Sequence, residues 1–290
     1  MGKQGNMTYT TRLRSTLEER YQDLGRNLSS VRLHSLCEPT ESPWTGPQDR
    51  VIGRFETAEL IDELVWHQII GRYKELGYSN IELEVDTSCP GRSCITLWQG
   101  KERGENALLF DFSIWTEYLE PVACHGRKFR CLGVDWLMLQ APPDEDFARS
   151  GVKRLPGQRF VSPRLGSQML KLLQNWAVRV GAETMMVVPE YFHSAVMFER
   201  GFTYLDPEMQ GLYEAAVHQL LPEHELAELS WRFEDGNVSL RNKPFYWPNE
   251  AQVAPLCAAL EVIFESEEYL ETRALTRQSA QFAVENRSEG

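Results

Sequence analysis

Residues 155–206 read LPGQRFVSPRLGSQMLKLLQNWAVRVGAETMMVVPEYFHSAVMFERGFTYLD, and this stretch decides the fold. It begins with a Pro-Gly turn and a loop, and it continues as a long segment with one apolar face. Gly181 is expected to end this helix, and a continuous apolar run from Met185 to Val188 predicts a strand covered on both sides. The apolar face of the helix consists of Leu165, Met169, Leu172, Leu173, Trp176 and Val180.

A short helix and a second strand, which begins near Gly201 and Phe202, complete the stretch. The order of loop, helix, buried strand, helix and strand is typical of a parallel crossover unit. Such a unit exposes backbone N–H groups at the N-terminus of its first helix, where they can bind a phosphate-sized anion. The sequence therefore predicts an anion-binding opening near Gly166.

Upstream of this unit the sequence predicts a meander of four strands, near residues 81–85, 95–97, 108–114 and 132–138. Their short connections favour antiparallel hairpins. Apolar residues at alternate positions of the last strand are expected to share one face: Leu132, Val134, Trp136 and Met138. A single helix is expected from residue 57 to residue 76, with a buried stripe of Ile61, Val65, Ile69, Tyr73 and Leu76.

Three regions follow from this pattern. Residues 1–78 are expected to form an N-terminal helical region, in which a capping box at Ser15 opens a helix. Residues 79–222 form the core and end in a helix over 207–221. Residues 223–290 are expected to add a hairpin over 230–240 and a helix that starts near Val253. The predicted fold class is α/β (α+β): a mixed, mostly antiparallel central sheet with flanking helices and with N- and C-terminal helical additions.

Composition and charge narrow the class of protein. The chain has 290 residues, a formal net charge of −12 and a mean hydropathy of −0.41. The negative charge argues against a nucleic-acid partner and against an anionic membrane surface. No apolar run approaches the roughly 18 residues that span a bilayer, and the first residues lack the apolar region of a secretory signal. A cytoplasmic location is therefore expected, with the six cysteines as thiols.

The order of elements resembles the GNAT superfamily of N-acetyltransferases, and two motifs carry the likeness. Residues 164–170, Arg-Leu-Gly-Ser-Gln-Met-Leu, resemble the end of the family's acyl-CoA loop and the start of the next helix. Residues 196–202, Val-Met-Phe-Glu-Arg-Gly-Phe, resemble its second signature. The resemblance implies a GNAT-like sheet and an N-acyltransferase that uses acetyl-CoA or another acyl-CoA and transfers the acyl group to an amine.

The resemblance also implies which residues hold the pyrophosphate of coenzyme A. Glycines in the family's loop let backbone N–H groups approach the phosphates at the positive end of a helix dipole. With Gly166 at the last motif position, Arg164 stands at the family's first glycine, and Val161 stands where the family has Arg or Gln. Arginines would then compensate, because guanidinium groups bind phosphate well. The implicated residues are Arg159, Arg164, Leu165, Gly166, Ser167 and Gln168.

The family's proton donor, often a tyrosine in the second motif, is replaced here by Phe198, which has no proton to give. Other side chains would then have to move protons, and a histidine can do so near neutral pH. Each candidate also has an ordinary structural role, as a capping residue or a solvated strand residue. The candidates are Glu190, Tyr191, His193 and Asp135.

Two alternatives stay open. Four cysteines could hold zinc as thiolates, although their spacing differs from that of zinc ribbons, and no metal site is expected. The incomplete loop motif and Phe198 also suit a GNAT-like module that has lost catalysis and acts in binding or assembly. Its partner would be another protein or a second copy of the chain. The four cysteines are Cys89, Cys94, Cys124 and Cys131.

Overall fold

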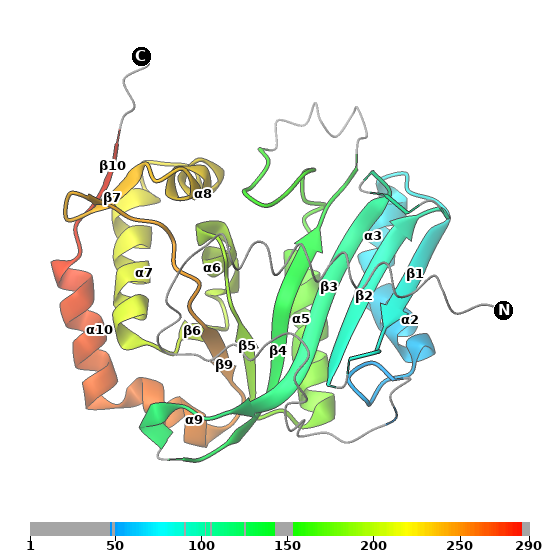
Figure 1. The fold of residues 1–290 in the computed structure, drawn as a ribbon, viewed down its shortest axis with the longest axis horizontal. Coiled ribbons are helices and arrows are strands. Elements are labelled where there is room, and N and C mark those ends of the chain that lie inside the picture. The colour runs from blue at the N-terminus through cyan, green and yellow to red at the C-terminus, as the bar shows by residue number, and fades with distance from the viewer. Residues whose placement is uncertain are drawn as a thin grey trace. The chain divides into compact units, whose positions relative to one another are not determined.

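The computed structural model describes Pro47 and residues 50–89, 91–101, 103–104, 106–124, 126–142 and 153–285. The chain divides into two compact units, Met1–Thr40 and Glu41–Gly290, and all described residues belong to the second. The predicted helix at Ser15 lies outside the described residues, and its prediction stays untested. The second unit is the subject of the description that follows (Figure 1).

A seven-stranded sheet organises this unit, in the order β1-β2-β3-β4-β5-β9-β6 (Figure 1). The strands are β1 (Ile81–Asp86), β2 (Arg92–Gln99), β3 (Leu108–Leu119), β4 (Phe129–Leu139), β5 (Thr184–Val187), β6 (Thr203–Tyr204) and β9 (Gln252–Pro255). β4 and β5 run parallel, whereas every other neighbouring pair runs antiparallel. The prediction of a mixed, mostly antiparallel sheet with flanking helices is confirmed.

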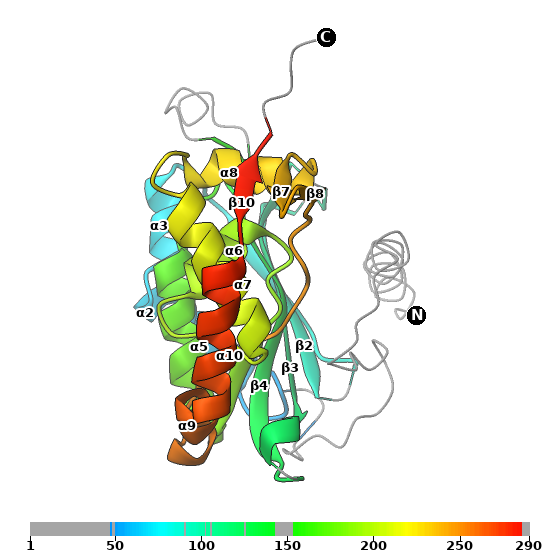
Figure 2. The ribbon, with the colours of Figure 1, turned by 90° about the vertical axis from the view of Figure 1, so that its left-hand side faces the viewer.

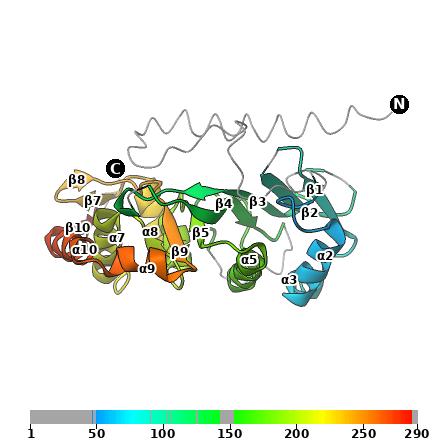
Figure 3. The same ribbon diagram turned by 90° about the horizontal axis from the view of Figure 1, so that it is seen from below.

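Three helices lie on the same side of strands β1 to β4: α2 (Thr57–Trp66), α3 (Ile69–Glu75) and α5 (Gly166–Val180) (Figure 3). They bury the apolar face of the sheet around Trp176 of α5. The indole of Trp176 stacks on Phe55, with 5.3 Å between ring centroids, and lies 6.4 Å from the ring of Phe112 on β3. α5 ends as predicted at Gly181, which takes a left-handed conformation with φ of 68°.

The prediction of a single helix from 57 to 76 is wrong, because the chain breaks the helix at Gln68. Gln68 has a left-handed conformation with φ of 60°, so α2 ends before it and α3 begins after it. The buried stripe of the first half therefore lies one residue earlier than predicted. The buried side chains are Leu60, Leu64, Ile69 and Tyr73, and Ile61 and Val65 are exposed.

A β-bulge in β4 changes which residues face the core. The register between β3 and β4 shifts between Ser113 and Ile114, and it leaves Asp135 as an extra residue on β4. Because side chains alternate along a strand, one extra residue reverses the alternation beyond it. Leu139 is therefore in the core and Met138 is not, so the predicted shared face over 132–138 is wrong.

The last strand of the main sheet comes from far along the chain. β9 pairs with β5 and β6, although residues 205–251 separate it from β6. This insertion contains α7 (Pro207–Leu220), α8 (Leu226–Glu234), β7 (Val238–Leu240) and β8 (Lys243–Pro244). α9 (Ala258–Glu265), α10 (Glu267–Ser279) and β10 (Phe282–Val284) follow β9. β10, β7 and β8 form a second sheet, and α7 and α10 pack side by side (Figure 2).

Two predictions for the C-terminal part are wrong. The hairpin expected over 230–240 is helix α8 followed by β7, because Leu226, Leu229 and Phe233 recur at helical spacing and give α8 a buried face. The helix expected from Val253 begins only at Ala258, and residues 252–255 form β9. The range 223–290, expected to be an extension, therefore contributes one strand to the main sheet.

Candidate functional site

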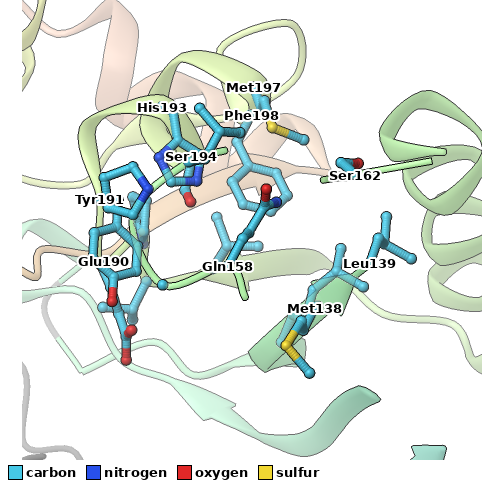
Figure 4. Close-up of a pocket in the computed structure, with 18 of the residues that line it drawn as sticks. Met138, Leu139, Gln158, Ser162, Glu190, Tyr191, His193, Ser194, Met197 and Phe198 are labelled. Atoms are coloured by element: carbon cyan, nitrogen blue, oxygen red, sulfur yellow. The ribbon is translucent and has the colours of Figure 1, made fainter. Parts of the chain in front are cut away.

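The two parallel strands of the main sheet separate at their C-terminal ends. Val134 and Val187 form the last pair between β4 and β5, and β4 then continues to Leu139. The chain after β5 leaves the sheet at Pro189, which has no N–H with which to continue the pairing. Between the separated strands lies a pocket of ≈ 120 Å³ (Figure 4).

Both strands, the loop over 155–162 and helix α6 (Phe192–Phe198) supply the wall of this pocket. Its apolar side chains include Val134, Leu137, Leu139, Val187, Met197 and Phe198. Its polar side chains include Asp135, Gln158, Glu190, Tyr191, His193 and Ser194. A mostly apolar wall with a few convergent polar groups is typical of small-molecule and cofactor sites.

All four predicted proton-transfer candidates line the pocket. Glu190, Tyr191 and His193 come from the turn into α6, and Asp135 comes from the bulge of β4. The rings of Tyr191 and His193 stack, with 5.5 Å between their centroids and 12° between their planes. The structure thus brings the four side chains to one pocket, and the bulge that places Asp135 there was not predicted from the sequence.

His193 is nearly fully buried, and this burial lowers its pKa to about 4 from an ordinary value of 6.5. The imidazole is therefore neutral at pH 7, so one ring nitrogen is a donor and the other is an acceptor. Nδ1 of His193 and Oε1 of Gln158 have no hydrogen-bond partner among the described residues. Because buried polar atoms are normally hydrogen-bonded, both atoms are candidates for ligand contacts (Figure 4).

Asp135 also belongs to a polar cluster on the sheet. It forms an ion pair with Arg92 of β2. Burial raises the pKa of Asp135, and the guanidinium of Arg92 opposes this rise. Burial and the nearby Asp135 also raise the pKa of Glu117 on β3 to about 7. The carboxyl group of Glu117, which interacts with Asp135, can therefore exchange a proton near neutral pH.

The residues predicted to bind the cofactor lie around the N-terminus of α5 and do not line the pocket itself. Leu165, at the N-cap of α5, is buried and provides no capping hydrogen bond. The N–H groups of an uncapped first turn suit an anion. Gly166 links this helix start to the pocket, because an added Cβ would lie 2.8 Å from Cε of Met197. The six predicted residues are Arg159, Arg164, Leu165, Gly166, Ser167 and Gln168.

Arg164 has the backbone conformation of a glycine. Its φ is 62°, and its N–H donates to Oγ of Ser162 at 3.3 Å. The motif resemblance aligns this residue with the first glycine of the GNAT loop, and its left-handed backbone is one that glycine favours. Arg159, the other predicted phosphate-binding arginine, lies over the ring of Phe160 with 5.6 Å to its centroid.

Arg164→Gly is expected to raise the free energy of unfolding by about 0.5–1 kcal/mol. The left-handed conformation costs an L-residue about 1–2 kcal/mol, and the larger entropy loss of glycine offsets part of the gain. Urea denaturation at pH 7 measures the change. Arg159→Gly is the matched control, because φ of Arg159 is not positive, and it should lower stability. A destabilised Arg164→Gly variant would show that this position is not strained.

Two features of the pocket were not predicted from the sequence. Gln158 projects into the pocket from its loop (Figure 4). Gly157, with φ of 76°, lets the loop pass the ring of Tyr191 so closely that an added Cβ would lie 2.7 Å from it. The available signal was the Pro-Gly dipeptide at 156–157, which marks a tight turn but does not say what the turn touches.

No family model matches the sequence, and no curated protein matches it. Among solved structures, the chain is similar to one in a crystal structure of a KacTA–DNA complex, with 10% sequence identity and a TM-score of 0.26. The match covers 70% of this chain and 86% of that chain. A likeness at this level says nothing about the function of this chain.

The exclusion of nucleic acid as a partner needs correction. That exclusion rests on the net charge of −12 alone. Net charge averages over the whole chain and does not decide what a single face binds. The prediction is therefore wrong as an exclusion. The complex says what that other protein binds, and DNA binding by this chain does not follow from it.

The described cysteines do not gather into a site. No group of three or more His, Cys, Asp or Glu side chains in the described part of the chain is placed to hold a metal ion. Burial raises the pKa of Cys94 to about 11 and raises that of Cys131 as well, which disfavours the thiolate that binds metals.

Among the helices that the structure describes, none has the length and apolar character needed to cross a bilayer.

Proposed function

We propose that the chain is an acyl-CoA-dependent N-acyltransferase of the GNAT type. One observation carries the proposal: the parallel strands β4 and β5 separate beyond Val134 and Val187 and leave a pocket, and Met197 of its wall lies next to Gly166 at the start of α5. A ligand with an anionic group at one end and a reactive group at the other fits this arrangement. The proposal keeps the expected cytoplasmic location.

The residues around the pocket fit acyl-CoA in two respects. The uncapped first turn of α5, with no acidic residue in it, suits a pyrophosphate. The apolar wall formed by Leu139, Met197 and Phe198 suits the extended arm of acyl-CoA. Oε1 of Gln158, which has no hydrogen-bond partner among the described residues, could accept a hydrogen bond from an amide N–H of that arm. When bound, acyl-CoA would supply an acyl group activated as a thioester.

The chain's own groups would then hold the amine and move its proton. A neutral His193 is able to accept a proton at an unprotonated ring nitrogen, and Glu190 and Asp135 lie at the same pocket. Holding the two reactants together would supply much of the rate acceleration. Phe198 takes no part in proton transfer, so the thiolate that leaves would take its proton from Tyr191 or from solvent.

A second candidate is a GNAT-like binding module without catalysis. It is favoured by Phe198, which lines the pocket and carries no proton at the position of the family's usual donor. The loop also differs from the family's, because Arg164 stands where the family has a glycine and Val161 stands where it has Arg or Gln. Such a module would bind acyl-CoA without releasing free CoA.

Acetyl-CoA is expected to bind the full chain, and Gly166→Val is expected to weaken this binding at least about tenfold. The added side chain would press on Met197 and would crowd the N–H groups at the start of α5, where the pyrophosphate is proposed to lie. Isothermal titration calorimetry with acetyl-CoA measures both affinities. Gly104→Val is the control, because nothing lies within 4 Å of a Cβ at Gly104.

Calorimetry and an assay for free CoA thiol together distinguish the enzyme from the binding module, and they can also contradict both. If titration with millimolar acetyl-CoA produces no heat of binding and does not raise the melting temperature, both the enzyme and the binding module are ruled out. Equal affinity of Gly166→Val and Gly104→Val would place the ligand elsewhere. Binding together with release of free CoA thiol in the presence of a panel of amines supports the enzyme, whereas binding without release supports the module.

A further inference from the structure

Helix α8 lies in the insertion over 205–251, outside the elements that form the pocket, yet it contacts two walls of the pocket. It packs against α6, as the ribbon also shows (Figure 1). Its residues also reach the loop that begins at Lys153 and continues through Leu155 and Gln158 along the pocket. One helix therefore touches both the loop wall and the α6 wall.

The contact with the loop consists of one hydrogen bond and one ion pair. Nε1 of Trp231 donates to the carbonyl oxygen of Arg154 at 2.9 Å. Nζ of Lys153 lies 2.7 Å from Oε2 of Glu225, the residue at the N-cap of α8. Both contacts are exposed to solvent, but salt screens only the ion pair, so the hydrogen bond is the one that persists at high ionic strength.

The loop transmits this contact to the pocket through a tight approach. Nη1 of Arg154 donates to the carbonyl oxygen of Arg159 at 3.3 Å. The N–H of Gln158 donates to the carbonyl oxygen of Leu155 at 3.1 Å. The loop is thereby a turn closed by two internal hydrogen bonds. Gly157 at its tip lies against the ring of Tyr191, so the position of the loop fixes the position of that ring.

The contact with α6 is aromatic and buried. The ring of Phe233 on α8 lies 4.6 Å from the ring of Phe192, the first residue of α6, and both side chains are almost fully buried. A buried aromatic pair resists separation because it loses contact area and favourable ring geometry when it opens. α8 is therefore anchored on α6 by Phe233 and holds the loop through Trp231.

We propose that α8 is a brace that sets the separation of the loop wall and the α6 wall, with Trp231 as the positioning residue. The brace itself requires no particular ligand, and only its effect on acetyl-CoA rests on the proposed function. Loss of the hydrogen bond frees the loop to move away from Tyr191. The pocket then widens, and a ligand has to reorder the loop when it binds.

The test compares Trp231→Phe with the wild-type chain. Phenylalanine keeps an aromatic ring but removes the N–H donor. Amide hydrogen exchange at Gln158 is expected to become about three- to tenfold faster, and the affinity for acetyl-CoA is expected to fall by a similar factor. The melting temperature should change by less than about 2 °C, because the side chain is 41% exposed. Trp66→Phe, on the 79% exposed tryptophan of α2, is the matched control.

Each outcome decides the inference. Faster exchange in the loop with weaker acetyl-CoA binding, at an unchanged melting temperature, supports the brace. Unchanged exchange at Gln158 overturns it. Faster exchange with unchanged affinity overturns the claim that the brace controls the pocket. If the wild-type chain binds no acetyl-CoA, the proposed function fails, and the exchange measurement alone still decides whether α8 holds the loop.

Discussion

Replacing Gly133 by alanine (Gly133→Ala) is expected to lower the free energy of unfolding by about 2–3 kcal/mol. Gly133 lies on β4 directly opposite Trp115 of β3, and an added Cβ would overlap the indole ring. The indole is 8% exposed and fills the space above the glycine, so it would have to leave its site or push the strands apart. Urea denaturation at pH 7 measures the loss.

The same substitution should also disturb the pocket, because Asp135 follows Gly133 by two residues and lies beside Trp115. We therefore expect weaker acetyl-CoA binding together with the loss of stability. Gly104→Ala is the control, since its surroundings are open, and it should change stability by less than about 0.5 kcal/mol. If the two variants are equally stable, the indole is not held against β4 in the way described.

Gly211→Ala is expected to destabilise the protein by about 2 kcal/mol or more, and to lower its melting temperature by about 5 °C. Gly211 lies on α7 where it crosses α10. An added Cβ would lie 2.5 Å from the carbonyl oxygen of Arg273 and 2.8 Å from Cβ of Thr276. Helix backbone cannot move aside as a flexible side chain can, so the two helices would have to separate. Differential scanning calorimetry measures the shift.

Gly201→Ala provides the comparison for this prediction. Gly201 follows α6, and the nearest atom to an added Cβ is Nε2 of Gln174 at 3.6 Å, which is an ordinary contact. Gly201 also has no positive φ, so alanine meets no backbone strain there. A melting temperature of Gly211→Ala equal to that of Gly201→Ala would mean that α7 and α10 do not approach as closely as described.

The elements with strong local periodicity were predictable. The long apolar face of α5 and the glycine that ends it needed only residues within one segment, and the structure has both. The alternation along β1 and β3 likewise led to the antiparallel meander. In these segments the side-chain period and the backbone preference agree, so neighbours along the chain suffice to determine the element.

The mispredicted elements depend on single residues or on distant partners. Gln68 takes a left-handed conformation that its residue type does not favour, and the bulge at Asp135 becomes visible only when β4 is paired with β3. β9 is a strand because a position between β5 and β6 is open to it. A segment as short as the four residues of β9 is compatible with a helix or with a strand, and the partner strand decides between them.

The same division holds for the candidate site. The sequence by itself determined the order of elements from the antiparallel meander to α7, the parallel crossover and the side chains that follow the buried strand, including Glu190, Tyr191 and His193. Only the tertiary structure decided that β4 and β5 separate beyond Val134, that Gln158 enters the opening, and that α8 reaches the loop. Periodicity is a property of neighbouring residues, so the sequence shows it directly. A pocket is bounded by side chains from segments far apart along the chain, and these segments meet only when the chain folds.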